Sequence, residues 1–171
     1  MRNVSRILPL LPGLAALTGC GQAQKSNEQN SKKPNIIYIY SDDLGIGDLS
    51  CYGATKISTP NIDRLAGQGA QFTNAYATSA TSTPSRFGLL TGMYPWRQEN
   101  TGIAPGNSEL IIDTACVTMA DMLKEAGYAT GVVGKWHLGL GPKGGTDFNG
   151  QISPNAQSIG FDYEFVIPAT V

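Results

Sequence analysis

The stretch "YATGVVGKWHLG", residues 128–139, decides the fold class, because it predicts a short buried strand that ends at Lys135, Trp136 and His137. The stretch before it, "TMADMLKEAGY" (118–128), predicts a helix that Gly127 ends. The packing face of this helix is expected to contain Met119, Met122, Leu123 and Ala126. A helix that leads into a buried strand is typical of an α/β fold.

Earlier stretches predict the same alternation of strands and helices. Residues 35–40 ("NIIYIY") are mostly apolar without strict alternation, which favours a strand buried on both faces of a parallel sheet. Thr59 can cap a helix that starts at Pro60 and ends at Gly67 or Gly69, and a strand is expected over residues 70–77. We therefore expect an α/β fold, with a largely parallel central sheet flanked by helices.

Two adjacent carboxylates, Asp42 and Asp43, follow the first predicted strand. Ligands of open α/β sheets bind at the carboxyl ends of the strands, which is where this pair would lie. Carboxylate oxygens favour calcium or magnesium over softer metals. The alternative is a solvated acidic turn, and the dipeptide alone favours that alternative.

The stretch "TSATSTPSRFGLLTG" (78–92) places several small hydroxyl residues and Arg86 before an apolar run. This pattern predicts the start of a helix. One of the hydroxyls could cap the helix or could carry chemistry, and the pattern alone does not decide between the two roles. The hydroxyl residues before Arg86 include Ser79, Ser82, Thr83 and Ser85.

Lys135 and His137 stand two positions apart at the end of the strand predicted within 128–139. On an extended segment such residues point the same way, so a lysine and a histidine could hold an anion and move a proton there. His137 is the single histidine of the chain. A structural histidine is the alternative reading of this position.

The N-terminal residues predict export and lipid anchoring. Residues 1–20 consist of a basic start, a short apolar stretch and the sequence "LTGC". The last four residues are similar to a bacterial lipobox, in which the cysteine, here Cys20, would be acylated. A plain secretory signal is the alternative. The polar residues 21–33 predict a flexible tether, and residues 34–171 the folded part.

Cys51 and Cys116 could form a disulfide, which two cysteines alone do not establish. The net charge of −1, with scattered basic residues, argues against a nucleic-acid partner.

The chain resembles the sulfatase family of the alkaline phosphatase-like superfamily over roughly residues 34–140. The resemblance rests on "PNIIYIYSDDLGIGDLSCYG", "TPNIDRLAGQGAQFTNAYA", "STPSRFGLLTG" and "GYATGVVGKWHLG", which occur in this order. The sulfatase signature is Cys or Ser, any residue, Pro, Ser and Arg, followed by an apolar stretch and Thr-Gly. Residues 82–86 and the pair Thr91 and Gly92 match this signature.

The resemblance implies a sulfuric ester hydrolase whose nucleophile is a formylglycine, made from Ser82 by a maturation enzyme that accepts serine. One hydroxyl of the hydrated aldehyde would attack sulfur, and elimination would later release sulfate and restore the aldehyde. Asp42, Asp43 and the modified Ser82 would contact a calcium ion. Arg86 would steady the diol, Lys135 would bind sulfate oxygens, and His137 would remove a proton from the diol.

The resemblance also has limits. The second histidine, the later Asp-Asn metal pair and the second lysine of the family have no convincing match, so the fold is expected to be incomplete on its C-terminal side and this chain alone inactive. A phosphonate or phosphate ester hydrolase of the same superfamily and a non-catalytic lipoprotein are the alternatives.

Substrate and location follow from the same resemblance. The expected substrates are sulfated carbohydrates or aryl sulfates, with hexosamine 6-sulfates suggested by the stretch after His137. The expected location is the bacterial envelope, with a lipid anchor in the outer membrane or facing the periplasm.

Overall fold

The computed structural model describes residues 33–169, and the contacts divide the chain into the units Met1–Tyr40 and Ser41–Val171. The expected signal segment with Cys20, and the tether up to residue 32, lie outside the described residues. Residues 33–40 form neither helix nor strand, and the side chains of Ile37 and Ile39 are 85% and 78% exposed. The buried strand predicted at 35–40 is therefore wrong. A strand requires a neighbour that pairs with its backbone, and the sheet of the described part contains only two later strands.

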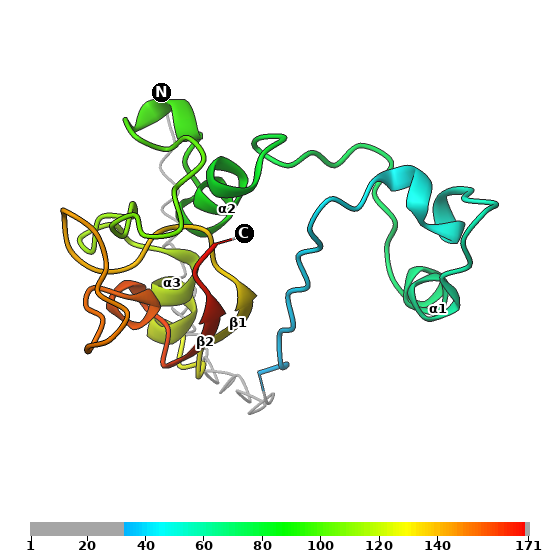
Figure 1. Cartoon of the computed structure of the whole chain (residues 1–171). Coiled ribbons are helices and arrows are strands. Elements are labelled where there is room, and N and C mark those ends of the chain that lie inside the picture. Colours follow the sequence, from blue (N-terminus) through cyan, green and yellow to red (C-terminus); the bar gives the residue numbers. More distant parts are fainter. Residues whose placement is uncertain (1–32, 170–171) are drawn as a thin grey trace, which may run out of the picture. The chain divides into compact units, whose positions relative to one another are not determined.

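The second unit contains helices and two parallel strands, and from Met119 onward helices and strands alternate (Figure 1). This alternation confirms the predicted α/β class, although the sheet in the described part has only two strands. Among residues 33–169, no helix is both long and apolar enough to cross a bilayer. The elements are the 3-10 helices η1 (Ile46–Asp48), η2 (Ser50–Tyr52), η3 (Pro95–Arg97) and η4 (Ala156–Ile159), the α-helices α1 (Pro60–Gln68), α2 (Ser82–Thr91) and α3 (Met119–Glu125), and the strands β1 (Gly131–Lys135) and β2 (Tyr163–Ile167).

Helix α1 has the bounds that the sequence predicts, starting at Pro60 and ending before Gly69. Thr59 occupies the N-cap position, but its side chain makes no capping hydrogen bond. It bonds to the side chains of Ser50 and Asp63 instead. The strand predicted at 70–77 is wrong, because these residues are exposed and form no strand. Their backbone, like that of residues 35–40, pairs with no strand of the described sheet.

Helix α3 is held by a capping box, in which the Thr118 hydroxyl accepts from the Asp121 amide and the Asp121 carboxylate accepts from the Thr118 amide. Gly127 stops the helix with φ 82°, as its position predicts. The predicted packing face is partly wrong, since Met122 is 56% exposed. The helix buries Ala120 instead, and Met119 packs at the edge of the core.

Strand β1 pairs in parallel with β2, with Val133 opposite Phe165. One face of the pair packs on the core through Val132 and Val166. The other face is exposed, and Val133 and Phe165 are 71% and 72% accessible. The strand predicted within 128–139 is therefore present but buried on one face only. Strand β2 was not predicted.

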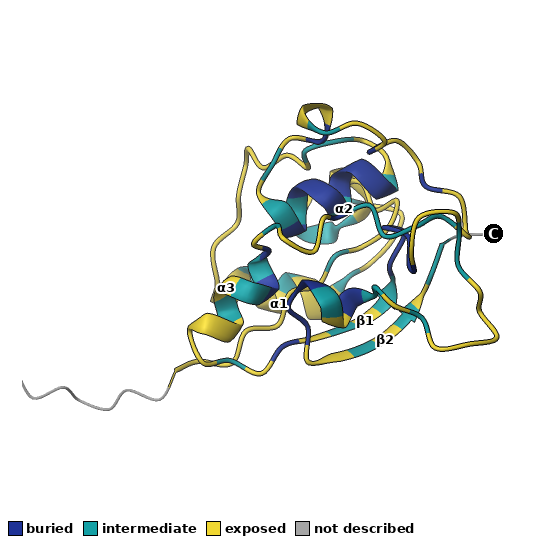
Figure 2. Ribbon diagram, turned by 90° about the vertical axis from the view of Figure 1, so that its left-hand side faces the viewer, coloured by how far each residue is buried: buried dark blue, intermediate teal, exposed yellow. Residues whose placement is uncertain are grey.

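The hydrophobic core lies under α2 and along the segment that follows β1 (Figure 2). Phe87 and Trp136 are its largest fully buried side chains, and the ring of Phe161 packs edge-on against Trp136. The segment after β1 is thus anchored by packing directly beside the residues predicted to be functional. The disulfide left open above is absent, because Cys51 and Cys116 are both free.

Candidate active site

Ser82 is the first residue of α2, so the predicted helix start is confirmed. None of the hydroxyl side chains before Arg86 caps this helix, because the N-cap residue is Thr81 and its side chain makes no capping hydrogen bond. The Ser82 Oγ instead accepts a hydrogen bond of 3.0 Å from Arg86 Nε, one helical turn later. The hydroxyl therefore lies at the positive end of a ten-residue helix and beside a cation, an environment that suits an anion.

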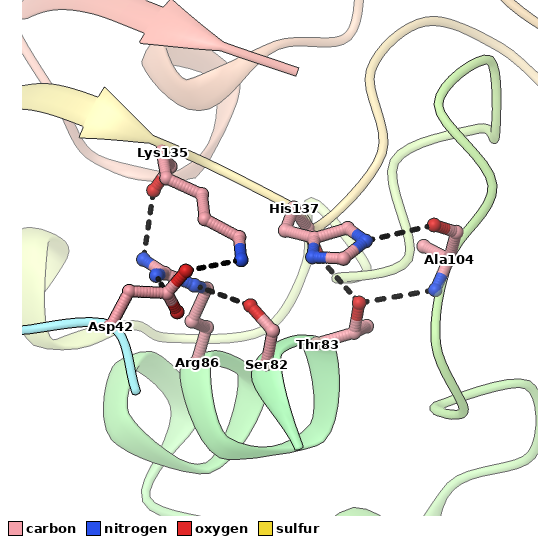
Figure 3. Close-up of polar contacts among 7 residues, drawn as sticks. All are labelled: Asp42, Ser82, Thr83, Arg86, Ala104, Lys135 and His137. Carbon is pink, nitrogen blue, oxygen red and sulfur yellow. Dashed lines mark hydrogen bonds and ion pairs between the residues drawn. The ribbon is translucent and has the colours of Figure 1, made fainter. Parts of the chain in front are cut away.

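Arg86 connects three of the residues that the sequence singled out, Ser82, Asp42 and Lys135 (Figure 3). Besides Ser82, its guanidinium donates to the Lys135 carbonyl oxygen at 2.8 Å and to Asp42 Oδ1 at 3.3 Å. The Arg86 side chain is only 12% exposed. One planar cation thus links the first turn of α2, the end of β1 and Asp42.

Asp42 pairs with two cations. Its Oδ2 lies 2.6 Å from Lys135 Nζ, and its Oδ1 contacts Arg86. The hydrogen bond from Lys135, opposed in part by desolvation and reinforced by Arg86, holds the pKa of Asp42 below its ordinary value. The carboxylate is consequently ionised at neutral pH and fixes the position of both cations.

Asp43 differs from its neighbour. It has φ 52°, in the left-handed region, and it makes no hydrogen bond or ion pair among the described residues. Within residues 33–169, no three His, Cys, Asp or Glu side chains gather closely enough to hold a metal ion. Calcium requires six to eight oxygen ligands. The described residues therefore offer oxygen donors of the right chemical class but not a complete metal shell.

His137 is 5% exposed and has φ 54°, an uncommon conformation for a residue other than glycine. The extended geometry of β1 therefore does not continue to His137, and Lys135 and His137 have different partners. Lys135 reaches Asp42, whereas the Nε2 of His137 lies 3.0 Å from the Ala104 carbonyl oxygen. The other ring nitrogen, Nδ1, is buried without a hydrogen-bond partner in the described structure.

Sequence reasoning did not connect Thr83 or Ala104 with this histidine. The Thr83 hydroxyl donates to the His137 carbonyl oxygen at 2.8 Å and accepts from the Ala104 amide at 3.1 Å. The signal that the sequence offered was a hydroxyl residue directly after Ser82. Ala104 acts through its backbone, so its side chain offered none.

Comparison with known proteins identifies the same family that the sequence motifs resemble. A sulfatase family profile matches residues 34–167. An N-acetylgalactosamine-6-O-sulfatase of Bacteroides thetaiotaomicron is 90% identical over the whole chain, which corresponds to 34% of that protein. Human arylsulfatase A is 47% identical over 67% of this chain and 23% of its own length.

A solved structure from work on the metabolism of multiple glycosaminoglycans by Bacteroides thetaiotaomicron superposes with a TM-score of 0.81. It is 94% identical, and the match covers 82% of this chain and 29% of that one. The chain thus spans about a third or less of the length of these proteins. The family profile covers most of the residues described above, from the acidic pair to β2, and the chain belongs to the sulfatase family.

Proposed function

We propose that this chain is the N-terminal portion of a sulfuric ester hydrolase that removes sulfate from a sulfated glycan, with a formylglycine formed from Ser82 as its nucleophile. The observation that carries this proposal is the contact of one guanidinium with Ser82 and Asp42, beside Lys135, at the N-terminus of α2. A monoanionic sulfate ester group bound there would meet two cations and a helix N-terminus.

Each cation has a distinct role in this proposal. Arg86 already donates to the oxygen of residue 82, so it would orient the hydrated aldehyde and stabilise the negative charge that develops on it. Lys135 carries three donors on a flexible stem, so its ammonium would turn from Asp42 toward sulfate oxygens when substrate binds.

His137 would serve as the base that takes a proton from the diol during elimination. Its buried ring contacts a carbonyl through Nε2, which leaves Nδ1 as the nitrogen able to accept a proton.

Proteins of this family generally bind a divalent metal ion. In this chain, Asp42, Asp43 and the modified Ser82 would supply oxygen ligands to it, and the chemistry of carboxylate ligands favours calcium. When bound, the metal would stabilise negative charge near residue 82. Since the described residues form only part of a metal shell, we expect no turnover from this chain alone.

The proposed substrate class comes from the relatives. The highly similar Bacteroides protein is named an N-acetylgalactosamine-6-O-sulfatase, and the chain is 90% identical to the corresponding third of it. We therefore propose a 6-O-sulfated N-acetylhexosamine within a glycan as the substrate.

We propose that the protein is located in the bacterial envelope, because the lipobox-like sequence at residues 17–20 would lead to acylation of Cys20. Labelled palmitate should then enter the protein, and Cys20→Ala should abolish the labelling.

The experiment that tests the function joins this chain to the remaining two-thirds of the Bacteroides relative and co-expresses it with a radical-type maturation enzyme. The peptide containing Ser82 should lose the mass of two hydrogens and react with an aldehyde-directed hydrazide. The chimera should release sulfate from N-acetylgalactosamine 6-sulfate in preference to phosphate from the 6-phosphate.

Two variants make this experiment decisive. Ser82→Ala should abolish both the aldehyde and sulfate release, and Ser79→Ala, as the matched control, should preserve both. Full activity with an unmodified Ser82 would show that the formylglycine mechanism is wrong. A preference for the phosphate ester would show that the enzyme is a phosphatase.

A further inference from the structure

The Thr83 hydroxyl is fully buried and joins two segments that are distant in the sequence. It donates to the carbonyl oxygen of His137 and accepts from the amide of Ala104. A threonine hydroxyl has one proton to donate, and in this geometry the proton is donated to the His137 carbonyl while the hydroxyl oxygen accepts from the Ala104 amide. Thr83 is therefore placed to control the positions of both residues.

His137 is held at three points. Its amide donates to the Pro168 carbonyl oxygen at 2.8 Å, its own carbonyl accepts from Thr83, and its ring Nε2 meets the Ala104 carbonyl. The left-handed backbone conformation of a non-glycine residue is costly and persists where its surroundings impose it. The contacts from Thr83, Ala104 and Pro168 provide such surroundings.

The contact with Ala104 decides which ring nitrogen carries the proton. A carbonyl oxygen only accepts hydrogen bonds, so the nitrogen 3.0 Å from it, Nε2, is the protonated one in the neutral ring. Nδ1 then has a free lone pair and no partner within the described residues. Figure 3 shows the imidazole over the first turn of α2, which carries Ser82 and Thr83.

We propose that Thr83 is a positioning residue that acts through His137. By fixing the backbones of Ala104 and His137 together, it holds the Ala104 carbonyl against Nε2, so that the neutral imidazole carries its proton on Nε2 and the Nδ1 lone pair is left free. This inference rests on the proposed function. In the elimination step, Nδ1 would take the proton of the free hydroxyl on the modified residue 82, that O–H electron pair would form the aldehyde C=O bond, and the C–O bond to sulfate would break with its electrons leaving on sulfate.

The single histidine of the chain makes the tautomer measurable without activity. The full chain, labelled with 15N-histidine and purified without a polyhistidine tag, is examined by NMR at about pH 8. The spectrum should show a proton bound to Nε2 and an unprotonated Nδ1. A proton on Nδ1 in place of Nε2 would overturn the proposal.

Two variants then separate positioning from packing. Thr83→Val keeps the shape and removes both hydrogen bonds, and the Nε2 proton should exchange with water at least about tenfold faster in this variant. Thr83→Ser keeps the hydroxyl and should retain the slow exchange of the wild type. A valine variant that is less stable but keeps the wild-type exchange rate and tautomer would show that Thr83 only packs. If the valine variant does not fold, the wild-type and serine spectra decide, because both must show the slowly exchanging Nε2 proton.

The chimera with the Bacteroides relative provides the catalytic readout. Thr83→Val should lower kcat about tenfold or more, change the KM for the sulfated sugar less than about threefold, and leave aldehyde formation at residue 82 intact. Thr83→Ser, which keeps the hydroxyl, should retain the kcat of the wild-type chimera. A wild-type chimera that carries the aldehyde but releases no sulfate would refute the proposed function, and the NMR experiment would still decide the tautomer and the role of Thr83 in fixing it.

Discussion

Residues 33–81 and residues 82–169 both contain apolar side chains but differ in how far these side chains are buried. No residue described between 33 and 81 is buried, although this region holds two runs that predict strands. Residues 82–169 contain the whole core of the described structure, from Phe87 to Phe161. The difference shows that apolar composition supplies a surface to bury, whereas burial depends on which partners the fold brings to it.

Amide hydrogen exchange should show the largest difference between the regions. The amide of His137 is bonded to Pro168 and lies beside the core, whereas the exposed residues Ile37 and Ile39 form no strand. We expect the His137 amide to exchange at least about a thousandfold more slowly than these two, since opening free energies range from near zero to the global stability. Exchange read out by mass spectrometry or NMR would measure this ratio. Equally slow exchange at all three amides would mean that residues 35–40 are protected as a strand after all.

Matched phenylalanines should show the next largest effect. Phe87 is completely buried in α2, whereas Phe72 is 68% exposed. Phe87→Ala should lower the free energy of unfolding by about 3–5 kcal/mol, because it leaves a cavity in the core. Phe72→Ala should change that free energy by less than about 0.5 kcal/mol. Urea denaturation of both variants measures this contrast, and equal losses would contradict the division into a packed and an exposed region.

Two helical glycines should respond in opposite directions. A Cβ on Gly88 in α2 would lie 2.2 Å from Thr78 Oγ1, whereas a Cβ on Gly67 in α1 would meet nothing within 4 Å. Gly88→Ala should destabilise the protein by about 1–3 kcal/mol through overpacking. Gly67→Ala should stabilise it by about 0.5–1 kcal/mol through helix propensity. A Gly88→Ala variant as stable as the wild type in thermal unfolding would show that α2 does not pack closely on residue 78.

The smallest expected effect concerns pH. The pKa of Asp162 is lowered by its hydrogen bond with Lys124 and then by the Thr130 backbone, and the pKa of Asp63 is lowered by the Ser50 hydroxyl and then by Thr59. A carboxyl whose pKa is lower in the folded state adds stability above its ordinary pKa of about 3.9 and loses it as the pH falls through the folded value.

Asparagine variants measure these contributions. Asp162→Asn and Asp63→Asn should each flatten the decline of the melting temperature below about pH 4. The effect should be larger for Asp162, whose partners come from α3 and from the residue before β1 in the packed region. Unchanged acid sensitivity of Asp162→Asn would show that this carboxyl does not couple to folding.

Local signals were sufficient for much of the fold. Pro60 and Gly69 bound α1, Gly127 stops α3, and the run at 131–135 forms a strand, because each depends on backbone preferences of neighbouring residues. Residues 35–40 and 70–77 failed as strands because a strand depends on its pairing partner, which no short window of sequence contains.

The sequence by itself determined which residues are chemically able to act: the Ser-x-Pro-Ser-Arg motif at 82–86, the acidic pair at 42–43, and the lone His137. Only the tertiary structure decided how they meet. Arg86 reaches Asp42 and the end of β1, and Thr83 and Ala104 hold the ring and backbone of His137. The physical reason is that residue type sets charge and hydrogen-bonding capacity, whereas these contacts of about 3 Å join positions tens of residues apart, and only the packing of the chain brings such positions together.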